Sequence, residues 1–320
     1  MTIQALMRRL AGLVLTVLIA STLSFFVFNI LPGDPAAVIV GLEGSPESIQ
    51  AVRAELGLDR PLGVRFLGWL SGLSRGDLGR SVHYEEPVLT LILSRLPLTA
   101  TLAAMAIFVA ALIGVPLGVL AAARRGRGVD WAATFFLQLG LAVPGFWLGI
   151  MAIMAFSLGL HIFPAGGYAG SGEGFLAGLG YLVLPALTLA VGRAAVLTRL
   201  TRAAMGEALS ANYVQAARGK GVTEAGVLFR HGLRNAVIPV LTTAGLQVGA
   251  LLAGSVVIER VFALPGLGTL LLLGVADRDL PLVQGLVVFF VLIVSLINLA
   301  VDLSYGVIDP RTRVGEGDGG

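Results

Sequence analysis

The only lysine of the chain, Lys220, is the first residue whose type and setting could serve chemistry, because phosphate-binding loops use a lysine. It stands between Gly219 and Gly221. A loop of the G-x-x-x-x-G-K-[ST] kind needs a hydroxyl residue after the lysine and a glycine where this chain has Val214. Neither requirement is met, so the chain has no such loop. If the protein uses ATP, a partner must bind it.

The histidines and two short glycine motifs are the other candidates for a catalytic or metal site. His83, His161 and His231 stand far apart and outside the apolar stretches described below, and the chain has no cysteine. Segment 72–76 matches the G-x-S-x-G of hydrolases, and segment 172–177 resembles a dinucleotide-binding turn. Both motifs need a preceding strand, and no strand pattern precedes either. We therefore predict no catalytic, cofactor-binding or metal site in this chain.

The elements that must position these residues are apolar helices. Hydrophobic types make up 56% of the 320 residues and charged types 13%, whereas soluble domains carry about 25% charged residues. This composition excludes most soluble enzymes, disordered chains and nucleic-acid-binding tails. Crossing the hydrocarbon core takes about 20 apolar residues, and backbone groups in lipid must be paired within a helix. Six stretches qualify: 10–31, 99–123, 131–160, 179–197, 237–257 and 282–303.

The positive charges predict the orientation of these six spans. The N-terminus, the loop near 124–130, the stretch 193–235 and the tail after 303 together hold 14 of the 22 basic residues but, with Asp302 counted on this side, only seven of the 19 acids. Basic residues collect on the cytoplasmic side of membrane proteins. We therefore predict that both termini are cytoplasmic. The first span is too long for the apolar part of a signal peptide and has no small-residue cleavage site, so we expect it to be retained.

The predicted organisation has four parts. Residues 1–31 form the tail and first span, 32–96 an external cap segment, 97–305 the main membrane domain, and 306–320 a cytoplasmic tail. In the cap segment, Ser45 and the following Pro-Glu pair predict a helix start, and Gly57 predicts its end. A second amphipathic helix is predicted from Pro61. The cap is too small to be an independent enzyme.

The cytoplasmic stretch between the fourth and fifth spans predicts two short helices. The first runs near 206–217 and presents small side chains, and the Gly-Lys-Gly of 219–221 ends it. Thr223 can cap the second helix, which has basic residues at its end. Helices with small side chains can approach another protein closely. By charge pattern alone, the stretch is equally compatible with an amphipathic loop on an acidic membrane surface.

Within the spans, small and polar residues have separate implications. Glycines at four-residue spacing, Gly114–Gly118, Gly145–Gly149 and Gly245–Gly249, predict close helix contacts. Proline residues such as Pro144 predict kinks. Four polar residues are expected to face protein or water and are candidates for a transport pathway, with hydrogen bonding between helices as the equal alternative: Asn29, Gln138, Gln247 and Asn298.

Residues 213–221 resemble the "EAA" loop of the membrane subunits of binding-protein-dependent ABC importers. Gln215 stands in place of the glutamate, and Tyr213-Val214 precedes Ala217-Arg218-Gly219-Lys220-Gly221, as in the permeases of the dipeptide, oligopeptide and nickel family. Seven further segments resemble that family in family order: 77–81, 95–97, 113–118, 144–149, 184–187, 265–268 and 309–311. The single first span followed by a folded outer segment resembles the B-type subunit.

The resemblance implies an all-α integral membrane protein with the six-helix type I ABC importer permease fold and a small folded external segment between helices 1 and 2. It implies a subunit that is no enzyme, in the bacterial inner membrane. Its partners would be a second related permease, two ATPase subunits that bind ATP-Mg, an external binding protein that delivers peptides, and membrane lipid, with no nucleic acid. The resemblance assigns ATPase coupling to Glu207, Tyr213, Gln215, Ala216, Ala217, Arg218, Gly219, Lys220 and Gly221.

Three alternatives stay open at this point. The same family moves dipeptides, oligopeptides, nickel chelates and glutathione, so the residues leave the substrate open. An intramembrane serine-type hydrolase would need a Ser–His pair within the spans, where the sequence has no histidine. A self-sufficient ion-coupled carrier would need buried acids and an internal repeat, and neither is visible.

Overall fold

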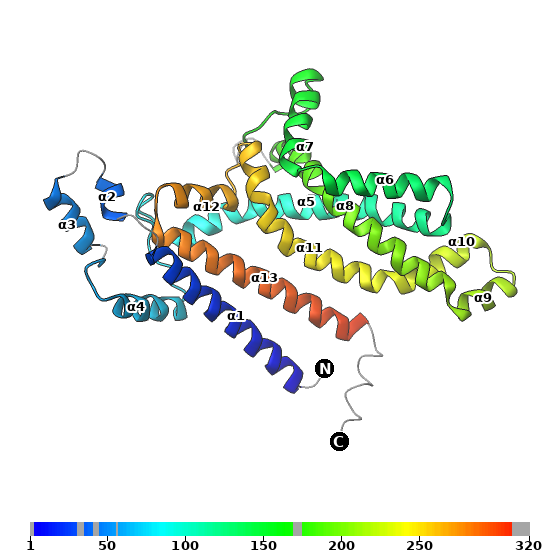
Figure 1. The fold of residues 1–320 in the computed structure, drawn as a ribbon, viewed down its shortest axis with the longest axis horizontal. Helices are drawn as coiled ribbons and strands as arrows, with labels where there is room; N and C mark the ends of the chain where they lie inside the picture. Colours follow the sequence, from blue (N-terminus) through cyan, green and yellow to red (C-terminus); the bar gives the residue numbers. More distant parts are fainter. Residues whose placement is uncertain (1–2, 31–34, 41–44, 56, 169–174, 309–320) are drawn as a thin grey trace. The chain divides into compact units, whose positions relative to one another are not determined.

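The computed structural model describes residues 3–30, 35–40, 45–55, 57–168 and 175–308, and the regular elements in these ranges are helices (Figure 1). Their only strand-like feature is an isolated bridge between Arg80 and Pro87. The helices are α1 (Ile3–Ile30), α2 (Pro35–Val40), α3 (Pro46–Glu55), α4 (Leu62–Ser74), α5 (Val88–Ala123), α6 (Gly128–Ala142), α7 (Gly145–Ala152), η1 (Ile153–Gly159), α8 (Phe175–Ser210), α9 (Asn212–Gly219), α10 (Glu224–Gly226), η2 (Val227–Leu233), α11 (Arg234–Val261), α12 (Leu267–Ala276) and α13 (Leu280–Ile308).

The helices that could cross a membrane confirm the all-α membrane architecture. Among the residues that the structure describes, five helices are long and apolar enough, and a sixth span results if the pair Gly128–Ala142 and Gly145–Gly159 is counted as one. That pair is bent by 98° at its break, so the apolar stretch 131–160 is not one straight helix. Pro144 stands at the break and caps α7, which confirms the predicted kink, since proline cannot continue the preceding helix.

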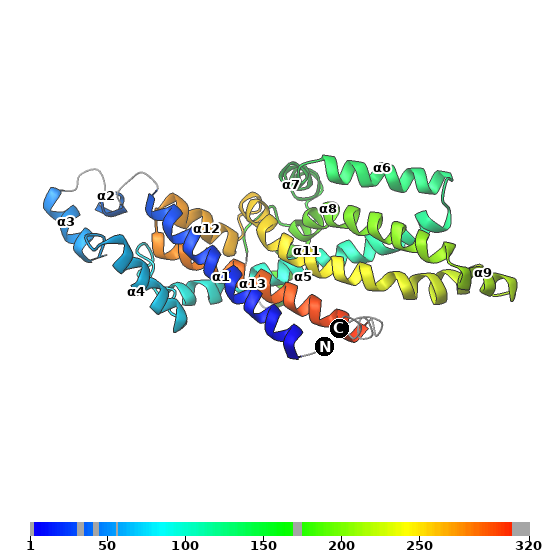
Figure 2. The same cartoon turned by 60° about the horizontal axis from the view of Figure 1, so that its bottom comes forward.

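The chain divides into two compact units, which we treat separately. The first comprises Ala100–Leu264 and the chain from Ile297, and the second Thr2–Thr99 and Pro265–Leu296. In the first unit, α8 packs along both α6 and α11, and the ribbons run side by side in both views (Figures 1 and 2). The division differs from the four parts expected from the sequence, which stay a prediction.

Glycines allow the close helix contacts of the first unit. A Cβ added at Gly114 would lie 2.8 Å from the carbonyl oxygen of Ala194, and one added at Gly118 would lie 2.5 Å from Cβ of Thr201. Both glycines are on α5 and face α8. At Gly245 an added Cβ would lie 2.3 Å from Val301. No side chain fits at these distances, so the predicted close contacts are confirmed at these positions.

The segment predicted as a cap belongs to the second unit, and the helix signals predicted within it are confirmed. The Ser45 hydroxyl accepts a hydrogen bond from the backbone N–H of Ser48 at 3.2 Å and so caps α3. Hydrogen bonds to the Glu47 carboxylate, first from its own backbone N–H and then from the Ser45 hydroxyl, lower the pKa of Glu47. Gly57 follows α3 with a φ of +62°, and Pro61 caps α4. The short helix α2 was not predicted.

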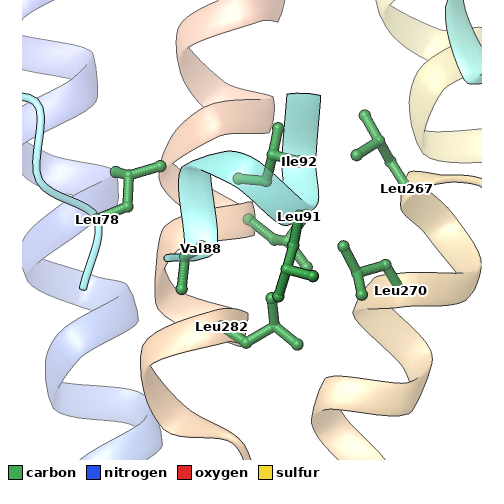
Figure 3. Close-up of a cluster of buried hydrophobic side chains, with 8 residues drawn as sticks. Leu78, Val88, Leu91, Ile92, Leu267, Leu270 and Leu282 are labelled. Atoms are coloured by element: carbon green, nitrogen blue, oxygen red, sulfur yellow. The ribbon is translucent and has the colours of Figure 1, made fainter. Parts of the chain in front are cut away.

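A buried cluster holds together the beginning of α5, α12 and α13 in the second unit. Figure 3 shows the apolar side chains that form it: Leu78, Val88, Leu91, Ile92, Leu267, Leu270, Leu282 and Leu286. Beside it, the buried Asp279 carboxylate accepts hydrogen bonds from the Ser81 hydroxyl and from the backbone N–H of Leu282. Asp279 therefore caps α13 and also fixes the loop that contains Ser81.

Candidate functional site

The predicted coupling segment forms helix α9, which follows the end of α8 after a single residue. Ala211, with an extended ψ of 147°, separates the two helices. The sequence predicted a helix from 206 to 217, and this boundary was wrong, because residues 206–210 complete the last turns of α8. The chain has no proline between Pro185 and Ser210 to end α8 earlier. Exposed Glu207 is therefore part of α8.

Helix α9 has one buried and one exposed face. Val214 is 0% exposed and Ala217 7% exposed, and α9 packs against α8 and η2. The side chains of Gln215, Ala216 and Arg218 are exposed. The exposed face continues into Gly219, Lys220 and Gly221, where Gly221 ends the turn with a φ of +77°. The structure thus places small and basic residues on a free surface outside the span bundle.

Two polar contacts fasten α9 to the elements that follow it. The Asn235 amide nitrogen donates a hydrogen bond to the Tyr213 hydroxyl at 2.8 Å. The Arg218 guanidinium pairs with the Glu224 carboxylate at 2.9 Å. These two contacts attach both ends of α9, one to α11 and one to α10.

The segment after α9 is continuous with the fifth span. The Thr223 hydroxyl accepts a hydrogen bond from the backbone N–H of Gly226, which confirms the predicted cap. The second short helix was expected to end near Arg234, but α10, η2 and α11 follow one another directly, and Glu224–Leu252 passes as a single candidate span. In Figures 1 and 2, α9 and α10 lie at the end of the paired helices α8 and α11.

A partly buried ion pair holds the α5–α6 turn against α8. The Asp130 carboxylate, 8% exposed, lies 2.6 Å from Nε of Arg202. It also accepts a hydrogen bond from the backbone N–H of Gly126. In the sequence, the two residues stand out only as charges of the segments predicted to be cytoplasmic. A carboxylate early in one helix and a basic residue 72 positions away give no local signal of pairing.

The four candidate pathway residues have different surroundings. Gln247 on α11 is 8% exposed, and its side-chain oxygen accepts a hydrogen bond from Arg193 of α8 at 2.8 Å. Gln138 and Asn298 are exposed at the surface of the chain. Asn29 belongs to α1, and its side chain lies outside the described residues. Only Gln247 is therefore placed in a polar contact between helices.

Arg193 stands four residues before the end of the predicted span 179–197, which placed it near a helix end. In the structure α8 continues to Ser210, so Arg193 lies within the helix. A second hydrogen bond runs from the Arg193 guanidinium to the carbonyl oxygen of Ala250 at 3.1 Å.

Among the described residues, no group of three or more His, Asp or Glu side chains could hold a metal ion.

Comparison with known proteins gives the family. The family model described as "Binding-protein-dependent transport system inner membrane component" matches residues 114–314, and the model of its N-terminal part matches residues 2–103. The chain belongs to this family. Its apolar helices are therefore those of a multi-pass inner-membrane transport component.

Relatives match over nearly their whole length. A protein of Brucella abortus (strain 2308), whose name describes a peptide transport system permease, is 42% identical over 96% of this chain and 98% of its own. The glutathione transport system permease GsiC of Escherichia coli O6:H1 is 42% identical over 96% of this chain and 97% of its own. The dipeptide transport system permease DppB of Escherichia coli K12 is 38% identical over 97% and 99%.

A solved structure has the same fold. An inward-facing MetNI methionine ABC transporter chain superimposes with a TM-score of 0.56 at 20% identity, covering 68% of this chain and 96% of that chain. The fold is thus that of a type I ABC importer permease.

Proposed function

We propose that this chain is a membrane-spanning subunit of an ATP-driven importer that moves peptides delivered by an external binding protein. The observation that supports this most directly is α9. It exposes a small and basic face, is fastened to α8 and α11, and belongs to a chain without a phosphate-binding lysine loop. ATP-Mg is bound by two ATPase subunits, and α9 is the part of this chain that contacts the ATPase.

In this mechanism, the packed helices of the first unit move together. When the ATPase subunits close on ATP, they displace α9, and its contacts to Asn235 and Glu224 pass the displacement to α11. Tight packing of α8 on α5 and α11 moves these helices together, because packed helices shift as units rather than deform. A second related permease completes the pore. Both ends of the chain lie on the cytoplasmic side of the inner membrane.

Peptides are the proposed substrate class because the related permeases named above are described as peptide, dipeptide and glutathione permeases. Glutathione is itself a tripeptide. Its permease is 42% identical to this chain and the dipeptide permease 38%. We therefore place di- and tripeptides before nickel chelates.

The test uses the complete transporter, with both permeases, the ATPase subunits and the binding protein, in proteoliposomes. We expect uptake of a labelled dipeptide to require ATP and the binding protein, and excess tripeptide or glutathione to compete more strongly than a nickel chelate. Uptake by this chain alone, or uptake driven by an ion gradient without ATP, would contradict the proposal.

A further inference from the structure

Arg193 places a full positive charge deep in the membrane domain. Its guanidinium meets α11 at Gln247 and Ala250. Arg193 itself stands 15 residues from the start and 17 from the end of the candidate span Gly178–Ser210, and 15 helical residues span about 22 Å, more than half the thickness of the hydrocarbon core. The charge is therefore near the middle of the bilayer and out of reach of lipid phosphates.

The partners of Arg193 hold the guanidinium in place but do not neutralise it. Gln247 supplies an amide oxygen, and Ala250 a carbonyl oxygen. Neither acceptor is an anion. In the part of the chain that the structure describes, Arg193 forms no ion pair with a carboxylate. The two hydrogen bonds use two of the five N–H donors of the guanidinium. Three donors and the whole charge are left for another group.

Charged residues at such a depth mark substrate or ion pathways, because their cost is tolerated only beside water or a counter-charge. The planar guanidinium matches a carboxylate in a bidentate pair. Every unmodified peptide has one carboxylate that is independent of its side chains. Recognition of this group would let one fixed arginine serve peptides of differing sequence.

We propose that Arg193, oriented by Gln247 and the carbonyl of Ala250, binds the C-terminal carboxylate of the peptide during its passage through the membrane. This inference rests on the proposed function and adds the chemical feature that the pathway recognises. It also assigns the facing surfaces of α8 and α11 around Arg193 to the transport pathway.

The experiment compares two substrates in the complete transporter, alanyl-phenylalanine and its C-terminal amide. Each is supplied at a concentration that saturates the binding protein, and initial ATP-dependent uptake is measured. The variants are Arg193→Gln, Arg193→Lys and, as a matched control on an exposed turn, Arg124→Gln. Since the binding protein is the same throughout, the change in the acid-to-amide ratio between variants isolates the contribution of the arginine.

We expect Arg193→Gln to lower uptake of the free acid at least tenfold and uptake of the amide less than twofold. Arg193→Lys should retain the preference for the acid, and Arg124→Gln should match the wild type. An equal fall for both substrates would overturn the inference and indicate a packing role. Unchanged uptake of the acid would overturn it as well.

A further outcome concerns the second permease. If Arg193→Gln separates the permease pair on size-exclusion chromatography, the arginine pairs with a carboxylate of that subunit, and the inference is overturned. Failure of the proposed function is recognised differently, because the wild-type transporter would then take up neither peptide.

Discussion

At the scale of single residues, small side chains determine how closely the helices of the first unit pack. Thr201 and the carbonyl of Thr198 on α8 occupy the space where a Cβ of Gly118 would lie. These neighbours are a backbone carbonyl and a β-branched side chain within a helix, which cannot move aside easily. The four-residue spacing in the sequence predicted the contact, but it could not identify which helix lies opposite.

The substitution Gly118→Ala tests this contact. The added methyl group would lie 2.5 Å from Cβ of Thr201 and 2.8 Å from the carbonyl oxygen of Thr198, so α5 and α8 must separate. We expect a loss of stability of about 1–3 kcal/mol, as for overpacked cores, measured by unfolding of the purified chain in detergent.

Gly68→Ala on α4 is the matched control, because nothing lies within 4 Å of a Cβ added there. Alanine in an open helical position should leave stability unchanged or raise it by roughly 0.5–1 kcal/mol. Equal destabilisation by both substitutions would show that α5 and α8 do not approach at Gly118.

Arg193 and Gln247 show what single residues reveal in a sequence and what they do not. The polarity of Gln247 predicted either a contact between helices or a place in the pathway, and the structure shows a contact with Arg193. The partner could not be predicted, because the predicted span 179–197 ends four residues after Arg193. Polar and basic residues follow Arg193 along the chain, so the apolar pattern ends before the helix does, at Ser210.

At the scale of elements, the Asp130–Arg202 pair joins the start of α6 to α8. The carboxylate is nearly buried, and the Arg202 side chain is 36% exposed. Removing one partner of a buried pair leaves an unpaired charge, which costs more than the pair itself contributes. The pair therefore holds the α5–α6 turn against the helix that leads to α9.

We predict that Asp130→Asn lowers the stability of the chain by about 1–3 kcal/mol, less than for a fully buried pair, because water reaches Arg202. The measurement is thermal unfolding in detergent. Asp59→Asn, at an exposed position of the cap segment, is the control and should change stability by less than about 0.5 kcal/mol. Equal effects of the two substitutions would contradict a structural role of the pair.

Elements were predictable where one local signal determined them. Ser45, Gly57 and Thr223 act as a cap or a helix end as predicted. Boundaries failed where packing extends a helix beyond its apolar stretch, as at the end of α8 and at the start of α11. Helix caps are determined by nearby residues, whereas the continuation of a helix depends on contacts with distant segments.

At the scale of the whole molecule, the sequence predicted a membrane protein because its charge deficit and its six apolar stretches leave few alternatives. The division into two compact units was not predictable, because it depends on contacts between segments far apart in the chain. The lack of a phosphate-binding loop in the sequence and the exposed α9 together support the proposal that this chain moves substrate only when an ATPase bound at α9 displaces it.

Binding of the ATPase to α9 tests that claim most directly. Ala216 is exposed on α9, whereas Ala203 is an exposed alanine on α8. Substituting arginine at each gives a matched pair of variants, and binding of the cognate ATPase to the permease pair is measured in detergent. The account predicts that Ala216→Arg weakens binding at least thirtyfold, while Ala203→Arg changes it less than twofold. Undiminished binding to the Ala216→Arg variant would contradict the account.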